Sequence, residues 1–230
     1  MTIKSSGQLA MSEIAAEFGG GAPYYLSSYY RNGGLVTNNN AAVPYSGAIS
    51  MSQFYGAERS VAGSWSRTSN GTYTLTIPTF STLTIDVRGA GGGGGGSTYD
   101  AGYAGTAGGN GGQSSVKNGG TTIMYGNGGG GGAGSYYNQA AAGSNGAASG
   151  GDTNTTGGGS NGGTGGTYGA TKGGNGGKGG RAVRTFSYGE NGNVAKGITL
   201  TVVVGNGGSG GAGQVNGTAG TDGAVYISWT

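Results

Sequence analysis

Cysteine and histidine are both missing from this chain of 230 residues. Without cysteine there is no disulfide bond and no thiolate metal site. Without histidine the commonest general base, the usual activator of a catalytic nucleophile and the commonest metal ligand are gone. These two absences count against an enzyme and against a metalloprotein.

Charge and long apolar runs are also scarce. Charged residues make up 8% of the chain, the formal net charge is +3, and the eleven Lys and Arg residues are scattered. No basic stripe follows a phosphate backbone, which argues against nucleic-acid binding. We also expect no signal peptide and no membrane-spanning segment, because the sequence has no apolar run of the required length. An adhesive role outside a cell would then need another exit route, such as lysis.

An enzyme built from this chain would have to rely on carboxylates. Two of them can serve as the acid and base of a glycosidase when the fold brings them together. They are few and widely spaced, so solvated or capping carboxylates are the simpler interpretation. The eight are Glu13, Glu17, Glu58, Asp86, Asp100, Asp152, Glu190 and Asp222. We therefore expect no catalytic residue, no metal and no cofactor.

Glycine is what the chain has in excess, since 52 of its 62 glycines fall between Gly89 and Gly223. Such a segment is either a flexible linker or backbone packed directly on backbone. A linker does not need the 15 tyrosines of this chain, and strand-like patterns flank the segment at both ends. Collagen is excluded because there are only three prolines. The run Gly91 to Gly96 follows a strand pattern, but no Gly-Lys-Ser/Thr ends it, so a phosphate loop has little support.

The Gly-Gly-x triplets favour packed polyglycine II helices. This helix has three residues per turn and no internal hydrogen bonds, so its N–H and C=O groups must bond to neighbouring helices. Glycine at two of every three positions lets those backbones touch. The alternative is a set of flexible loops on a β-sandwich. The expected rods are Gly105 to Gly112, Gly126 to Gly134, Gly157 to Gly166, Gly173 to Gly180 and Gly205 to Gly213.

Strands are expected on both sides of the glycine segment. Apolar and polar residues alternate over 72–77 and 83–87, on either side of Pro78-Thr79, which predicts a β-hairpin. Residues 198–204 and 224–229 have the composition of two more strands. A glycine insert that begins and ends on one sheet has its ends held together, which favours order.

The first 60 residues have an ordinary composition and an internal repeat. The pattern S-G-x-[LI]-x-M-S-x-[IF] occurs at 6–14 and again at 46–54. Ser12 and Ser52 can each cap a short helix that Gly19 or Gly56 ends. About 60 residues are marginal for independent stability, so this module is expected to lean on a partner. We divide the chain into a module of residues 1–60 and a glycine-rich domain of residues 61–230. The expected fold is mostly β and irregular, with short helices in the small first module and a β-strand framework that brackets packed polyglycine II helices.

Three stretches of the second domain resemble a known family. They are Ile85 to Gly94, Leu200 to Gly208 and Gly220 to Trp229, and in this order they resemble the glycine-rich domain of tail fibre and tail tip proteins of tailed bacteriophages. The resemblance covers about residues 65–230. The stretch Ser46 to Ala57 resembles a short module recurrent in phage virion proteins, and covers residues 1–60. Phage adhesins that cap long tail fibres are similar in plan, with an attachment domain followed by packed polyglycine II helices and variable distal loops.

The resemblance implies a virion protein at the tail fibre or tail tip that binds a host receptor. Its partners would be other tail or fibre proteins and a bacterial surface receptor, either protein or glycan, with a homotrimer as an open possibility. The protein would be assembled in the host cytoplasm and released by lysis. The alternative is a structural connector or decoration protein of the tail that binds no receptor. An ice-binding lattice is a third hypothesis, but the varied residues at the x positions spoil a flat repeated face.

Candidate contact residues follow from this plan. If rods pack side by side, side chains can stand only at their ends, where they do not force backbones apart. Tyrosine there gives contact area at low entropy cost, although each ring could instead cover the glycine body. The expected receptor contacts are Tyr99, Tyr103, Tyr136, Tyr137, Tyr168 and Tyr188. The expected virion-attachment residues are Leu9, Ile14, Phe18, Ile49, Phe54 and Tyr55.

Overall fold

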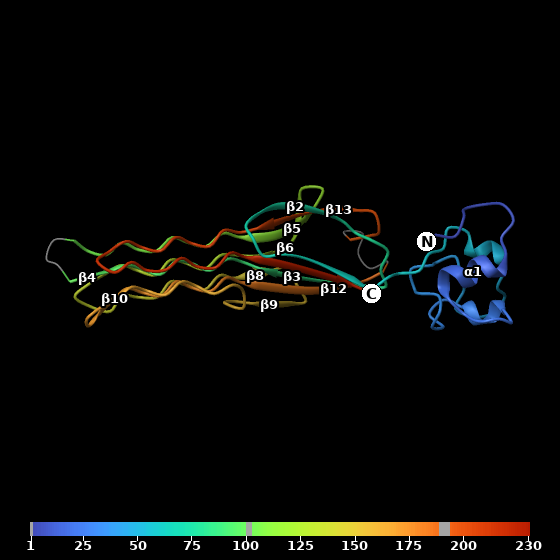
Figure 1. The fold of residues 1–230 in the computed structure, drawn as a ribbon, viewed down its shortest axis with the longest axis horizontal. Helices are drawn as coiled ribbons and strands as arrows, with labels where there is room; N and C mark the ends of the chain where they lie inside the picture. Colours follow the sequence, from blue (N-terminus) through green and yellow to red (C-terminus); the bar gives the residue numbers. More distant parts are fainter. Residues whose placement is uncertain (1, 100–102, 189–193) are drawn as a thin grey trace.

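A computed structural model describes residues 2–99, 103–188 and 194–230. The fold is mostly β, with 30% strand and 7% helix, as the sequence predicts. It has three parts in a row: a small helical module, a β-sandwich and a long bundle of extended chain (Figure 1). The helical module and the far end of the bundle lie at opposite ends of the molecule. Along the described parts of the chain, no helix has the length and apolar character that crossing a bilayer requires.

The first module is built around α1 (Met11–Phe18) and two 3-10 helices, Leu26–Tyr29 and Met51–Phe54. The repeated motif gives the same local structure twice. Gly7 and Gly47 both take a positive φ, of 91° and 86°. Four residues later a helix begins, and the side chain of its third residue accepts the N–H that precedes the helix, Glu13 from Ala10 at 2.7 Å and Gln53 from Ser50 at 2.7 Å. Ser12 therefore lies inside α1 and not at its cap, which is Ala10.

Two hydrophobic cores are present. The first holds Ile14, Phe18, Tyr29 and Phe54, with Phe54 packed edge-on against both other rings at 6.4 and 6.3 Å. The second core fills the sandwich. A junction around Glu58 joins the two parts, because its carboxylate accepts hydrogen bonds from the Thr79 hydroxyl and the Lys196 ammonium.

The sandwich consists of two five-stranded sheets. The first has the order β1 (Gly63–Arg67), β14 (Ala224–Trp229), β3 (Thr82–Arg88), β12 (Arg181–Ser187), β9 (Thr153–Thr155). The second has the order β2 (Gly71–Thr76), β13 (Thr199–Val204), β5 (Ser114–Asn118), β6 (Thr121–Gly126), β8 (Ala148–Ser149). All neighbouring strands in these sheets are antiparallel. Their inner faces enclose a core that includes Leu83, Ile85, Val116, Val202 and Ile227.

The predicted hairpin of residues 72–87 is wrong. β2 pairs with β13 and β3 pairs with β14 and β12, so the two strands belong to opposite sheets. The connection between them contains Ile77 and Phe80, which are 1% and 0% exposed. Two large buried side chains in a five-residue connection fit a chain that passes between the sheets, whereas a hairpin turn would leave them in water.

Four short strands lie at the far end of the bundle. β4 (Ser97–Thr98) pairs in parallel with β7 (Ser135–Tyr136), and β10 (Thr167–Tyr168) pairs with β11 (Thr171–Lys172). Strands of the sandwich continue directly into rods of the bundle. The chain runs from the sandwich to this end and back four times. We call this far end the tip.

The bundle is a hexagonal polyglycine II lattice around one central rod, residues 89–96. Successive N–H groups of this rod donate to three different neighbours: Gly92 to Gly177 at 2.9 Å, Gly93 to Gly109 at 2.8 Å and Gly94 to Thr218 at 2.9 Å. Its carbonyl oxygens accept from three further rods. The six neighbours, in order around the centre, are 105–112, 127–135, 173–180, 159–166, 217–223 and 205–213. An eighth rod, 140–147, bonds to 127–135 and 173–180 on the outside.

A rod has three registers, each formed by residues three apart that point to the same side. The number of registers that are glycine follows the number of sides on which the rod touches the backbone of another rod. In the central rod, a Cβ at Gly91, Gly92 or Gly93 would lie within 2.0 Å of a carbonyl oxygen of Asn161, Gly130 or Ser209, on three different rods. From Gly91 to Gly96 all three registers are therefore glycine, whereas Ala90, which follows β3 by two residues, carries a methyl group. In contrast, the rod 217–223 keeps glycine in one register only, Gly217, Gly220 and Gly223, of which the first two face the central rod.

Five of the eight rods were predicted. The sequence analysis left the central run without a structural role and missed the rods 140–147 and 217–223. Their signal was present as single glycines at every third position, Gly143 and Gly146 in one case and Gly217 and Gly220 in the other. These rods lie at the edge of the lattice, where most registers can carry a side chain.

Candidate receptor-binding tip

The tip is where side chains replace glycine. Each rod rises about 3.1 Å per residue, so the eight residues of the central rod place the tip about 25 Å beyond the sandwich. Ser97 ends the central rod and its N–H donates to the carbonyl of Val215 at 2.9 Å, which closes the lattice. The connections beyond this level carry the tip tyrosines.

Four tip tyrosines form one exposed cluster. The rings of Tyr136 and Tyr137 have centroids 4.1 Å apart, Tyr137 and Tyr99 are 4.8 Å apart, and Tyr99 and Tyr168 are 6.5 Å apart. These residues come from three separate connections between rods. Between 36% and 55% of each residue is exposed to solvent. We call this set, Tyr99, Tyr136, Tyr137 and Tyr168, the tyrosine cluster.

Tyr137 takes an unusual backbone conformation to join the cluster. Its φ is 57°, in the left-handed region that costs a bulky residue roughly 1–2 kcal/mol. A glycine or asparagine would fit this position with less strain. The two close ring contacts of Tyr137 depend on this turn, so the strain coincides with the exposed aromatic surface. Such outliers are concentrated at functional sites.

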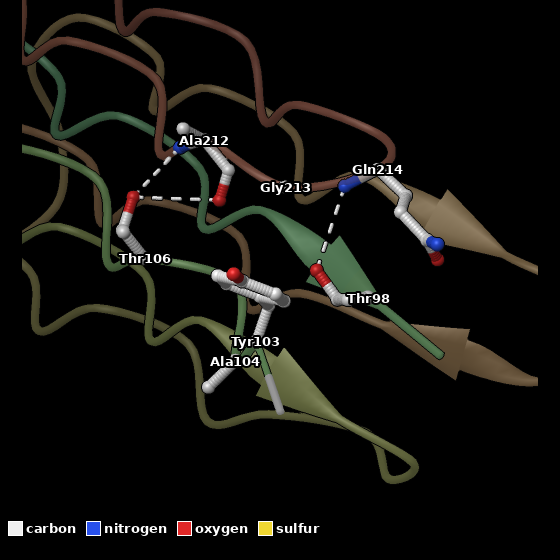
Figure 2. A pocket seen from close by; sticks show the side chains of 7 residues that line it. All are labelled: Thr98, Tyr103, Ala104, Thr106, Ala212, Gly213 and Gln214. Carbon is white, nitrogen blue, oxygen red and sulfur yellow. Dashed lines mark hydrogen bonds between the residues drawn. The ribbon is translucent and has the colours of Figure 1, made fainter. Parts of the chain in front are cut away.

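Tyr103 lies beside a pocket of about 350 Å³ at the same end of the molecule. It is the most exposed of the tip tyrosines, at 78%. Figure 2 shows its ring between the side chains of Thr98 and Thr106. The pocket and the tyrosine cluster adjoin, because the side-chain oxygen of Gln214, a lining residue, accepts the backbone N–H of Tyr99 at 3.0 Å.

The prediction that Tyr188 belongs with these residues is wrong. Tyr188 follows β12 at the sandwich and packs against the second core, with its ring 5.9 Å from that of Phe80. Tyr188 was expected at a rod end because it lies between the runs Gly173 to Gly180 and Gly205 to Gly213. β12 fills that interval and carries the chain away from the tip.

The residues expected to attach the first module to a virion divide into two groups. Ile14, Phe18 and Phe54 are at most 2% exposed and form the first core, so they hold the module together and do not contact a partner in this conformation. Leu9 and Ile49 are half-buried and pack against that core. The Tyr55 hydroxyl donates to the carbonyl of Gly7, which ties the two copies of the repeated motif together.

Every carboxylate in the described residues has a structural partner. Asp86 on β3 accepts hydrogen bonds from Arg88 and Arg181, both at 2.8 Å, and the ion pair lies on the outer face of the first sheet. Burial by itself would raise the pKa of the Asp86 carboxyl, but hydrogen bonds from the two arginines outweigh it and hold the pKa below its ordinary value. The pKa of Glu58 is lowered in the same way, with Lys196 and Thr79 opposing the effect of burial.

The remaining carboxylates bind the backbone or single cations. Glu17 accepts the N–H of Arg59 at 2.8 Å, and Asp222 accepts that of Gly207 at 2.8 Å. Glu13 pairs with Lys4 at 2.7 Å, and Asp152 lies 3.7 Å from Arg184. Asp100 and Glu190 lie outside the described residues. Within the described chain, no cluster of carboxylates has the arrangement of a metal site.

Comparison with protein-family models, with curated proteins and with solved structures finds no match for this chain.

Proposed function

We propose that this chain is a phage virion protein at the tail fibre or tail tip, and that it binds a host receptor through the tip. The observation that carries this proposal is the tyrosine cluster. Three connections that are far apart in sequence bring four partly exposed rings together at the end of a rigid bundle. Monomeric proteins seldom expose such a patch without a binding partner.

The lattice suits this role mechanically. Its rods are fastened to one another by backbone hydrogen bonds along their whole length, so the tip is held at a fixed distance from the sandwich. Preorganised aromatic rings bind with a small loss of conformational entropy. The first module lies at the opposite end of the molecule, where attachment to other tail proteins leaves the tip free (Figure 1).

Binding of the purified chain to a panel of bacterial strains tests the proposal. We expect saturable binding to susceptible strains. A Tyr136→Ala/Tyr137→Ala double variant should bind at least about thirtyfold more weakly, since a true hot spot contributes about 2 kcal/mol or more. Its melting temperature should stay close to that of the parent, because both side chains are exposed and lie outside the two cores.

The matched control is Tyr45→Ala. Tyr45 is 54% exposed but lies in the first module, at the other end of the molecule. This variant should bind cells as the parent does. Equal binding by the double variant and the parent would contradict a receptor surface at the tyrosine cluster and would favour the structural-connector alternative.

A further inference from the structure

The pocket beside Tyr103 is built from two rod ends and one strand. Among the residues that the structure describes, seven line it: Thr98, Tyr103, Ala104, Thr106, Ala212, Gly213 and Gln214. Thr98 ends β4, residues 103–106 begin the rod that follows, and residues 212–214 leave another rod. The pocket therefore sits directly on the lattice, and its floor is positioned by backbone hydrogen bonds such as that from Thr106 N–H to the Ala212 carbonyl at 2.8 Å.

Most polar atoms at this pocket are already bonded inside the tip. The Thr106 hydroxyl accepts the Ala212 N–H at 2.7 Å and donates to the Ala212 carbonyl at 3.4 Å. The Thr98 hydroxyl accepts the Gln214 N–H at 3.4 Å. These bonds are drawn in Figure 2, which also shows the Gln214 amide group pointing away from the Tyr103 ring. None of the seven lining residues carries a charge.

What the pocket offers a partner is therefore mainly apolar. Its lining includes the ring of Tyr103, two alanines, Ala104 and Ala212, and two threonines whose hydroxyl groups are bonded within the tip. An anionic group would need a cation, and a sugar would need several directed donors and acceptors, and the lining side chains provide neither set. Covering the Tyr103 ring, which is 78% exposed, removes apolar surface from water and is favourable by itself.

We propose that this pocket receives one hydrophobic side chain, of leucine to phenylalanine size, from a protein segment of the receptor. The proposal rests on the receptor-binding function of the tip and adds a second contact to it. The tyrosine cluster would cover the surrounding surface, while the pocket anchors a single residue. Its volume of about 350 Å³ is at the lower end of the range for ligand sites.

Amide spectra of the full chain test the pocket without any receptor. The probes are N-acetyl-phenylalaninamide, N-acetyl-leucinamide and methyl glucoside, each titrated to tens of millimolar. We expect saturable shifts at the amides of Ala104, Ala212 and Gln214 with the two amino-acid amides, and none with the glucoside. Shifts with the glucoside alone would overturn the proposal, and so would the absence of shifts with all three probes.

Two variants locate the binding. Ala212→Leu fills the pocket and Tyr103→Ala removes its wall, so each should weaken probe binding by at least about tenfold. The matched control is Ala219→Leu, which adds the same side chain at another solvent-exposed position on the neighbouring rod. Equal binding by Ala212→Leu and Ala219→Leu would also overturn the proposal.

Cell binding by the same variants separates this proposal from the function that it extends. Ala212→Leu should bind susceptible cells at least about tenfold more weakly than Ala219→Leu, and proteinase treatment of the cells should abolish binding by the parent. A parent that binds no strain contradicts the receptor-binding function. A parent that binds cells equally well before and after proteinase treatment contradicts only the protein anchor in this pocket.

Discussion

Replacing Gly94 by alanine places a methyl group inside the lattice, in the middle of its central rod. The added Cβ would lie 2.0 Å from the carbonyl oxygen of Thr164 and 2.3 Å from its carbon. Both are backbone atoms, so no side-chain rotation relieves the contact. The two rods must move apart by more than 1 Å to reach an ordinary van der Waals contact of about 3.5 Å. This displacement pulls on the bonds that Gly94 makes to Thr218 and Gly211.

The expected cost combines three terms. Overpacking in a well-packed interior costs about 1–3 kcal/mol, and weakening two backbone hydrogen bonds costs about 1 kcal/mol each. Alanine also lowers the conformational entropy of the unfolded chain, which offsets the loss of unfolding free energy by about 0.4–1 kcal/mol. The net loss of unfolding free energy is about 3 kcal/mol. For a chain of this size, this lowers the melting temperature by roughly 6–12 °C.

Thermal unfolding followed by calorimetry measures this change. The matched control is Gly21→Ala, since a Cβ at Gly21 would meet no atom within 4 Å. That variant should melt within about 1 °C of the parent. If Gly94→Ala melts at the same temperature as Gly21→Ala, the rods are not packed backbone on backbone, and the segment is a set of loops.

Two further predictions concern the ion pair and the first core. Asp86→Asn should destabilise the chain by about 2 kcal/mol at pH 7, because two charge-assisted hydrogen bonds are lost. The folded pKa of Asp86 is lowered, so its contribution is fully present above the ordinary carboxyl range and is lost as the pH falls below about 4. Melting curves of variant and parent should therefore converge toward pH 3, and a constant difference would contradict the role of this ion pair. Phe54→Ala should destabilise the first module by about 3–5 kcal/mol, since Phe54 is fully buried between two rings. Calorimetry should show that the first module melts at a lower temperature while the transition of the sandwich is unchanged. A thermogram identical to that of the parent would show that this core contributes little to stability.

The central rod shows how composition alone can specify a tertiary position. A polyglycine II helix has three residues per turn, so each register points to one side. A run of five or six glycines leaves all three sides open to contact, and it occurs both in the central rod and in the rod 127–135. The run Gly91 to Gly96 therefore indicated a rod in close backbone contact on all three sides, and the triplets of Gly173 to Gly180 indicated a rod with two close contacts. The pattern was predictable because backbone packing depends on the absence of a side chain and not on which side chain is present.

Sheet membership could not be obtained in this way. The alternation in residues 72–77 and 83–87 identified two strands, and both exist. Whether they pair depends on the path of the five residues between them. That path was decided by the burial of Ile77 and Phe80 between the sheets, and a local pattern carries no information on what lies opposite.

The arrangement of the tip depends on both the sequence and the tertiary structure. The sequence indicated that no side chain fits between packed rods, because a Cβ there would strike a carbonyl oxygen, and the choice of rod ends for the large rings placed five of the six chosen tyrosines at the tip. Only the tertiary structure decided which of them touch. Tyr99, Tyr137 and Tyr168 come from connections that are remote in sequence, and the register of the lattice brings them to one level. Tyr188 lies elsewhere because the rod 173–180 returns the chain to the sandwich, where the ladder pairing of β12 with β3 fixes the position of the residues that follow.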